Sequence, residues 1–196
     1  MIDFRHKKYK GAEMLPYERE KLYNWVLDSK PRNILEVGCG NGGATWPMAE
    51  ALKLAKSNSK IFACDPERKL SRSLLLKYPS VVFYPVRSDE MISHILYKGI
   101  DIDFIFFDGP EDPHVAMNDI WRLEEVIPKG AYFAMHDWEF VTRGYDSGLS
   151  AKAKYIRPYM EHSKKWVEVE VLSGLEGNVD KGCFDSVGLC LYRYDK

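Results

Sequence analysis

Two patterns of hydrophobic residues alternate along most of the chain. Short, continuous apolar runs predict buried strands at residues 33–37, 61–64, 81–84, 103–107 and 131–135. Between these runs, apolar residues repeat at helical spacing, which predicts helices at 16–27, 70–78, 91–97 and 115–126. One more helix follows the first strand, with Pro47 in its first turn and Met48, Leu52 and Ala55 on its core face. Strands that alternate with helices in this way predict a parallel sheet with helices on both faces.

The last part of the chain follows a different pattern. Residues 151–162 are expected to form a helix, residues 166–172 alternate as a half-buried strand, and residues 187–192 form another extended run. A glycine-containing loop, rather than a helix, joins the two extended runs, which predicts an antiparallel end of the sheet. We therefore expect one domain over residues 1–196, of the α/β, doubly wound, Rossmann-like class. It would have a mostly parallel seven-stranded sheet with an antiparallel C-terminal edge strand, and residues 1–30 as a helical N-terminal extension.

Composition narrows the class of protein without naming its chemistry. The chain has 196 residues, 45% of them hydrophobic, which suits one globular domain and excludes a disordered protein. Its 28 Lys and Arg residues balance 29 Asp and Glu residues to a formal charge of −1, which argues against a dedicated nucleic-acid binder. No run of roughly 20 apolar residues and no secretory signal is recognisable, and the four cysteines are scattered. We therefore expect a cytoplasmic protein with reduced thiols and no membrane partner.

The sharpest local feature is segment 36–43, Glu-Val-Gly-Cys-Gly-Asn-Gly-Gly, which joins the first strand to the following helix. Glycines are needed where the backbone takes a positive φ or approaches a ligand closely, and such a turn borders the ligand crevice of an α/β sheet. The spacing fits both the GxGxxG pattern of dinucleotide binding and the ExGxGxG pattern of nucleoside–methionine binding. Glu36 favours the second ligand, because a carboxylate there suits an ammonium group and repels a diphosphate.

Residues 34–49 resemble motif I of the class I S-adenosylmethionine-dependent methyltransferases, and the resemblance extends over about residues 15–135. It implies S-adenosylmethionine as the cofactor. The methionine part would then be surrounded by Glu36, Gly38, Cys39, Gly40 and Gly42. Asp65, at the end of the second strand, would bind the ribose hydroxyls. Ser88 and Asp89, after the third strand, would contact the adenine, although Asp89 could instead cap the following helix.

Polar residues follow the fourth and fifth predicted strands, at Asp108, His136 and Asp137. Because the carboxyl ends of parallel strands meet at one end of the sheet, we expect these side chains to converge on the cofactor, Asp108 among its contacts. Their spacing resembles the metal-dependent O-methyltransferases of small molecules, of the catechol, macrocin and cephalosporin-tailoring types. That resemblance implies that the three residues hold Mg²⁺ or another divalent metal against the acceptor hydroxyl.

Two catalytic roles for His136 stay open at this point. The catechol type has a lysine base shortly after its first metal-binding acid, and segment 109–112 has no lysine. His136 could therefore ligate a metal, or it could remove the acceptor proton itself while Asp108 or Asp137 orients the ring. Residues 138–148, a predicted loop with aromatic side chains and one arginine, could form an acceptor pocket or a packed surface loop.

The function expected from the sequence is methyl transfer to a hydroxyl of a small acceptor, such as a sugar, a phenol or a natural-product intermediate. No nucleic-acid partner is expected, and the chain could form a homodimer. A non-catalytic nucleoside-binding module of the same fold is the first alternative, because the lysine base is missing. A nicotinamide-dependent oxidoreductase is the second, and its Tyr-x-x-x-Lys pattern occurs only at the chain ends, at 17–21 and 192–196.

Overall fold

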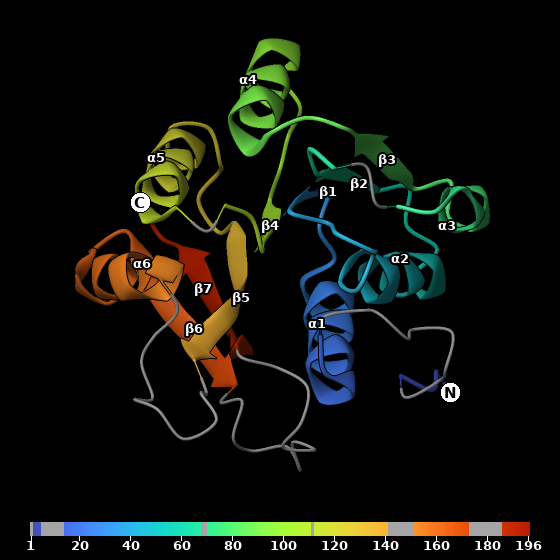
Figure 1. Ribbon diagram of the computed structural model, residues 1–196, viewed down its shortest axis with the longest axis horizontal. Helices are drawn as coiled ribbons and strands as arrows, with labels where there is room; N and C mark the ends of the chain where they lie inside the picture. Colours follow the sequence, from blue (N-terminus) through green and yellow to red (C-terminus); the bar gives the residue numbers. More distant parts are fainter. Residues whose placement is uncertain (1, 5–13, 68–69, 111, 141–150, 173–185) are drawn as a thin grey trace.

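The computed structural model describes residues 2–4, 14–67, 70–110, 112–140, 151–172 and 186–196. Within these ranges, seven strands form one sheet in the order β3-β2-β1-β4-β5-β7-β6 (Figure 1). The strands are β1 (Asn33–Val37), β2 (Lys60–Cys64), β3 (Val81–Tyr84), β4 (Phe104–Phe107), β5 (Tyr132–Phe140), β6 (Trp166–Leu172) and β7 (Ser186–Tyr194). The strand order reverses between β1 and β4, which is where a doubly wound sheet forms its ligand crevice.

Strands β1 to β5 run parallel, and β7 pairs antiparallel with both β5 and β6. The expected Rossmann-like sheet, mostly parallel with an antiparallel C-terminal end, is therefore confirmed. Within that end, β7 lies between β5 and β6, so β6 is the edge strand. The central strands β1 and β4 are almost entirely buried, because both of their faces are covered, and this explains their continuous apolar sequences.

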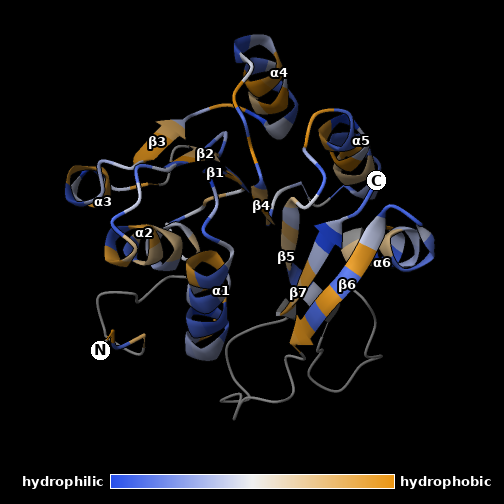
Figure 2. Ribbon diagram, turned by 180° about the vertical axis from the view of Figure 1, so that it is seen from behind, coloured by the Kyte–Doolittle hydropathy of each residue, from blue (hydrophilic) through white to orange (hydrophobic). Residues whose placement is uncertain are grey.

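The described helices cover both faces of the sheet. They are α1 (Pro16–Ser29), α2 (Thr45–Leu54), α3 (Arg72–Lys77), α4 (Ser88–Lys98), α5 (Pro113–Glu124) and α6 (Ala151–His162). Helices α1 to α3 share one core with Ile34 and Phe106, whereas α4 to α6 share the other with Leu35 and Phe107 (Figure 1). Neighbouring strand residues thus serve opposite cores, and the helices combine hydrophobic and hydrophilic stripes (Figure 2). Among the described helices, none is long and apolar enough to cross a membrane.

Two residues differ from what their sequence patterns predict. Ala55, predicted on the core face of the second helix, is exposed because α2 ends at Leu54 and Ala55 is its C-terminal cap. Trp138, predicted to begin a loop, belongs to β5 and is fully buried, with its ring centroid 5.8 Å from that of Tyr192. β5 extends beyond its apolar run because β7 continues to pair with it. The rest of the predicted acceptor loop, residues 141–148, lies outside the described residues.

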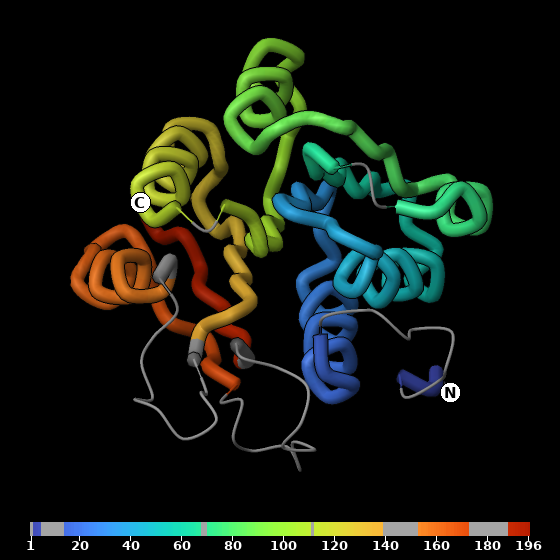
Figure 3. The backbone as a smooth tube through the Cα atoms, viewed as in Figure 1, coloured from blue at the N-terminus to red at the C-terminus, as the bar shows by residue number. Residues whose placement is uncertain are grey.

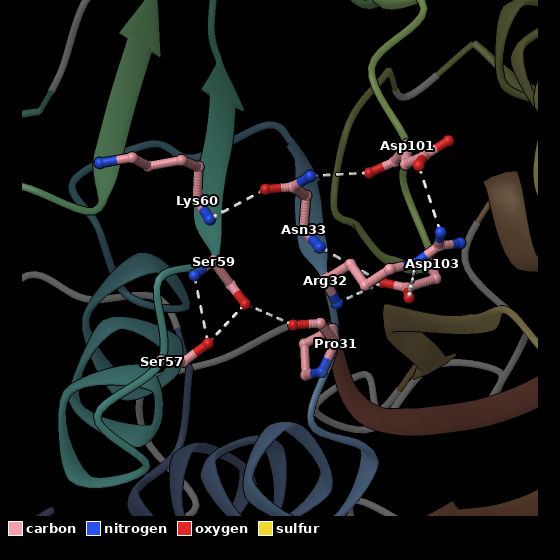
Figure 4. Close-up of polar contacts among 8 residues, drawn as sticks. All are labelled: Pro31, Arg32, Asn33, Ser57, Ser59, Lys60, Asp101 and Asp103. Carbon is pink, nitrogen blue, oxygen red and sulfur yellow. Dashed lines mark hydrogen bonds and ion pairs between the residues drawn. The ribbon is translucent and has the colours of Figure 1, made fainter.

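A polar network joins the amino ends of β1, β2 and β4 (Figure 4). The backbone N–H and the Nε of Arg32 donate to the carboxylate of Asp103, over 2.8 and 3.1 Å, and its Nη1 lies 3.2 Å from a carboxylate oxygen of Asp101. Asn33 donates its side-chain amide to the carbonyl of Asp101 at 2.9 Å and accepts the N–H of Lys60 at 3.0 Å. These contacts tie β1 to the strands on either side of it.

Candidate active site

The glycine-rich segment 36–43 leaves β1 through a turn in which φ is 80° at Gly38, 47° at Gly40 and 88° at Gly42. At Gly38, a Cβ atom would lie 2.2 Å from the backbone carbonyl oxygen of Asp108, so only glycine lets the ends of β1 and β4 approach this closely. At Gly40, a Cβ atom would meet no atom of the described residues within 4 Å. The backbone of Gly40 therefore borders open space, as the approach of a ligand requires.

Asp65 follows β2 and contacts the glycine loop. Its carboxylate accepts hydrogen bonds from the backbone N–H of Gly40 at 3.0 Å and of Glu67 at 2.9 Å. In the same loop, the N–H of Cys39 donates to the carbonyl of Cys64 at 3.2 Å, and burial raises the pKa of the Cys39 thiol. Asp65 is thus held against the loop by backbone donors, whereas the side chain of Cys39 serves packing.

Glu36 is the fully buried acid of β1. Both of its carboxylate oxygens lie 2.8 Å from the hydroxyl of Thr45, the first residue of α2. Burial raises the pKa of Glu36 to about 8; the hydrogen bond from Thr45 opposes this rise, and the charges of Asp108 and Asp65 add to it. A carboxyl group in this state is mostly protonated near neutral pH and ionises when a cation is placed beside it.

The predicted adenine contacts lie at the start of α4, directly after β3. Ser88 is buried, and Asp89 lies within the first turn rather than at the N-terminal cap, which is Arg87. The carboxylate of Asp89 is 3.4 Å from the Nε of Arg87, and its backbone carbonyl accepts a hydrogen bond from Arg122 of α5 at 3.1 Å. Asp89 therefore links α4 to α5 and does not cap the helix.

An irregularity in β5 brings two consecutive side chains to one site. The pairing of β5 with β7 shifts register between His136 and Glu139, and Asp137 has a φ of 58°, in the left-handed region. In a regular strand, consecutive side chains point to opposite faces. Here the bulge brings a carboxylate oxygen of Asp137 to 3.1 Å from Nδ1 of His136. Active sites are among the places where such strained backbone is found, although Lys30 and Lys56 of this chain also have a positive φ.

His136 is the centre of an acidic cluster drawn from three parts of the chain. Its Nδ1 lies 3.4 Å from a carboxylate oxygen of Asp108, which follows β4, and on the other side of the ring Nε2 lies 3.2 Å from Glu18 of α1. The side chains of His136 and Glu18 are 3% and 0% exposed, whereas those of Asp108 and Asp137 are both 17% exposed. The ring therefore has one fully buried neighbour and two that reach solvent.

The charge of this ring bears on its chemistry. Burial lowers the pKa of His136, but the three surrounding carboxylates raise it to well above its ordinary value, Asp108 most of all. These carboxylates therefore favour the protonated form of the ring. An imidazolium has no free lone pair, so metal ligation and general-base catalysis both require that His136 first release its Nδ1 proton, and both roles stay open.

The family model of a methyltransferase domain matches residues 35–138, more than half of the chain, from β1 to the bulge of β5. The chain belongs to this methyltransferase family. Among curated proteins, none matches the methyltransferase by sequence. Membership of this family confirms the resemblance expected from motif I and argues against the nicotinamide-dependent alternative.

Solved structures share the fold of this methyltransferase. An O-methyltransferase from Bacillus cereus in complex with S-adenosylhomocysteine has a TM-score of 0.67 and 16% identity, over 94% of this chain and 83% of that one. The O-methyltransferase TomG from Streptomyces achromogenes, involved in tomaymycin synthesis and solved with S-adenosylmethionine, has a TM-score of 0.68 and 15% identity, over 94% and 82%. A proposed rRNA methylase from Clostridium thermocellum has a TM-score of 0.63 and 13% identity, over 89% of this chain and 96% of that one. At such identities the likeness concerns the fold.

The structure brings Asp108, which follows β4, together with His136 and Asp137, which lie within β5 and not after it. One ligand atom from each of Asp108, His136 and Asp137 lies within 4.8 Å of the other two. Carboxylate oxygens suit Mg²⁺ or Mn²⁺, and the imidazole nitrogen shifts the preference toward a transition metal. The residues therefore fit a divalent cation by type and by spacing.

Three residues of the site were not found from the sequence: Glu18, Thr45 and Gly188. The N–H of Gly188 in β7 donates to Glu18 at 2.7 Å, and the hydroxyl of Thr45 donates to Glu36. Glu18 is the third residue of its helix and accepts the N–H of Leu15 at 2.7 Å, a pattern that signals a helix start and nothing more. Thr45 and Gly188 have no sequence signal at all.

Proposed function

We propose that this methyltransferase transfers a methyl group from S-adenosylmethionine to a hydroxyl of a small molecule, assisted by a divalent metal held by Asp108, His136 and Asp137. One observation carries the proposal. The backbone of Asp108 abuts Gly38 of the glycine loop, and its carboxylate lies 3.4 Å from Nδ1 of His136. The loop expected to bind the cofactor and the cluster that suits a metal therefore meet at one residue.

The carboxyl end of the sheet offers what a sulfonium nucleoside needs. Open space beside Gly40 admits the ligand, the carboxylate of Asp65 can accept hydrogen bonds from ribose hydroxyls, and Glu36 can ionise beside a cationic methionine part. Two solved structures of this fold support this choice of cofactor, because the Bacillus cereus enzyme was solved with S-adenosylhomocysteine and TomG with S-adenosylmethionine.

Methyl transfer breaks the bond between sulfur and the methyl carbon, leaves the electron pair on sulfur, and forms a bond from the acceptor oxygen, whose proton must leave. A bound divalent metal supplies a lower pKa and a fixed orientation for the acceptor hydroxyl. Asp108 and Asp137 are partly exposed and border solvent, which receives the proton. Glu36 and Asp65 would hold the cofactor while Gly38 keeps β1 and β4 close.

A small acceptor is favoured over RNA by the charge of the site. Several acids lie at this end of the sheet, and a phosphate backbone would be repelled by them. The fold does not decide the question, because a proposed rRNA methylase shares it. The formal net charge of −1 also gives no electrostatic attraction toward nucleic acid.

Calorimetry tests the cofactor and the metal together. The protein is titrated with S-adenosylmethionine, S-adenosylhomocysteine and NAD, each in Mn²⁺, in Mg²⁺ and in EDTA. We expect both methionine nucleosides to bind and NAD to give no heat. Binding of NAD alone would overturn the proposal.

Turnover is then measured as S-adenosylhomocysteine release with a panel of catechols, sugars and aliphatic alcohols. We expect release that depends on one acceptor class and stops in EDTA. Release that is unchanged in EDTA would remove the metal from the proposal but keep the methyl transfer. Tight nucleoside binding with no release from any acceptor would favour the non-catalytic module instead.

A further inference from the structure

Glu18 connects α1 to the reacting end of the sheet through three contacts. Its Oε1 accepts the backbone N–H of Gly188 at 2.7 Å, and its Oε2 accepts the N–H of Leu15 at 2.7 Å and lies 3.2 Å from Nε2 of His136. The carboxylate is fully buried. Figure 3 traces the chain through α1, at the start of the sequence, and through β5 and β7, which come more than a hundred residues later.

The contacts of Glu18 lie on both strands of the β5 bulge. Pairing between β5 and β7 runs from His136–Leu189 to Glu139–Val187, so Gly188 is opposite two positions of β5, which has one residue more than β7 there. A bulge leaves backbone groups without their ladder partners. The carboxylate of Glu18 accepts the N–H of Gly188 there and, with its other oxygen, meets the imidazole that precedes the bulge.

We propose that Glu18 is a positioning residue: its carboxylate holds the Nε2 side of the His136 ring, so that Nδ1 faces Asp108 and Asp137 and is the nitrogen offered to the metal. This inference rests on the proposed function. Proteins orient metal-ligating histidines by pairing the other ring nitrogen with a carboxylate or a carbonyl. Glu18 lies outside the matched residues 35–138, so α1 supplies a part of the site that the family model does not include.

The test compares Glu18→Gln with Glu20→Gln, an exposed acid of the same helix that serves as the matched control. A glutamine amide can turn only one oxygen toward these donors, so its NH₂ group would face either the N–H of Gly188 or the Nε2–H of His136. Two readouts are taken on the full chain. One is Mn²⁺ affinity without cofactor, and the other is the ¹H–¹⁵N signal of the His136 Nε2–H, assigned by its absence in His136→Gln.

We expect Glu18→Gln to lose or shift the Nε2–H signal and to bind Mn²⁺ about 10–100-fold more weakly. Glu20→Gln should keep both at the wild-type values. An unchanged Nε2–H signal in folded Glu18→Gln would overturn the proposal. If Glu18→Gln fails to fold by thermal unfolding, Glu18→Asp, one methylene shorter, is measured with the same expectations and the same overturning result.

The failure of the metal assignment would look different. If the wild-type protein binds no Mn²⁺, the metal part of the proposed function is wrong, and Glu18 is judged by the Nε2–H signal alone. Loss of that signal in Glu18→Gln would still support the positioning of the ring. Its persistence would overturn the positioning as well.

Discussion

The two ends of the sheet both carry acidic side chains, but these side chains differ in their partners and in their burial. At the amino end, Asp101 and Asp103 contact Arg32, whose side chain is 57% exposed. At the carboxyl end, the carboxylates of Asp108, Asp137 and Glu18 surround the buried ring of His136. The two amino-end acids share one cation, Arg32, near solvent, where ion pairs contribute little to stability. An acid of this sheet therefore becomes a candidate functional group through its partners and its burial.

The largest effect should come from crowding the carboxyl end. Gly38→Ala places a Cβ 2.2 Å from the carbonyl oxygen of Asp108 at a φ of 80°. Left-handed backbone and overpacking together should lower the free energy of unfolding by roughly 2–5 kcal/mol, as measured by urea denaturation. The control is Gly40→Ala, which meets no atom of the described residues within 4 Å and should cost about 1–2 kcal/mol from its backbone alone. Equal losses in the two variants would contradict the close approach of β1 and β4.

The second effect separates the acids of the two ends. Asp108→Asn removes a carboxylate that faces His136 and should weaken Mn²⁺ binding at least about tenfold, as measured by calorimetry. Asp103→Asn, which weakens the contact with Arg32 at the amino end, should leave Mn²⁺ affinity unchanged. If both variants bind Mn²⁺ like the wild-type protein, the cluster around His136 is structural, as the amino-end network is.

The position of the site at the carboxyl end of the sheet could be predicted from the sequence, whereas the contacts between its residues could not. Segment 36–43 could be recognised because all its residues are consecutive, and Asp108 and His136 because parallel strands end together. Glu18 could not be placed, because its contact with His136 joins residues 118 positions apart and its own sequence position signals only a helix start.

The bulge of β5 could not be predicted from the sequence for a related reason. The φ of Asp137 and the burial of Trp138 depend on β7, which pairs with β5 from the far end of the chain, so a local pattern reads these positions as the start of a loop. The exposure of Ala55 was missed because helical spacing continues past the residue at which α2 ends. A distant strand therefore decided the outcome at Asp137 and Trp138, whereas the end of its own helix decided it at Ala55.

The smallest effect concerns Glu36, an acid at the carboxyl end of the sheet. Its described hydrogen-bond partner is the hydroxyl of Thr45, which carries no charge. The Glu36 pKa of about 8 in the folded protein exceeds its ordinary value of 4.5. Between these two pH values, the folded state therefore holds a proton that the unfolded state has released. Stability should therefore fall as the pH rises, by at most about 1.4 kcal/mol between about pH 6 and about pH 7. Glu36→Gln, which does not titrate and can still accept from Thr45, should show a flatter dependence in urea denaturation.

Saturating S-adenosylhomocysteine should flatten the wild-type dependence as well, because its ammonium group lowers the pKa of Glu36 and removes the difference between the folded and unfolded states. The amino end offers the control, since Asp103→Asn should keep the wild-type slope with and without the nucleoside. A wild-type slope that Glu36→Gln leaves intact would assign the pH dependence to another group. A slope that the nucleoside does not change would mean that no cationic part of the ligand lies beside Glu36, and the two ends of the sheet would then differ at His136 alone.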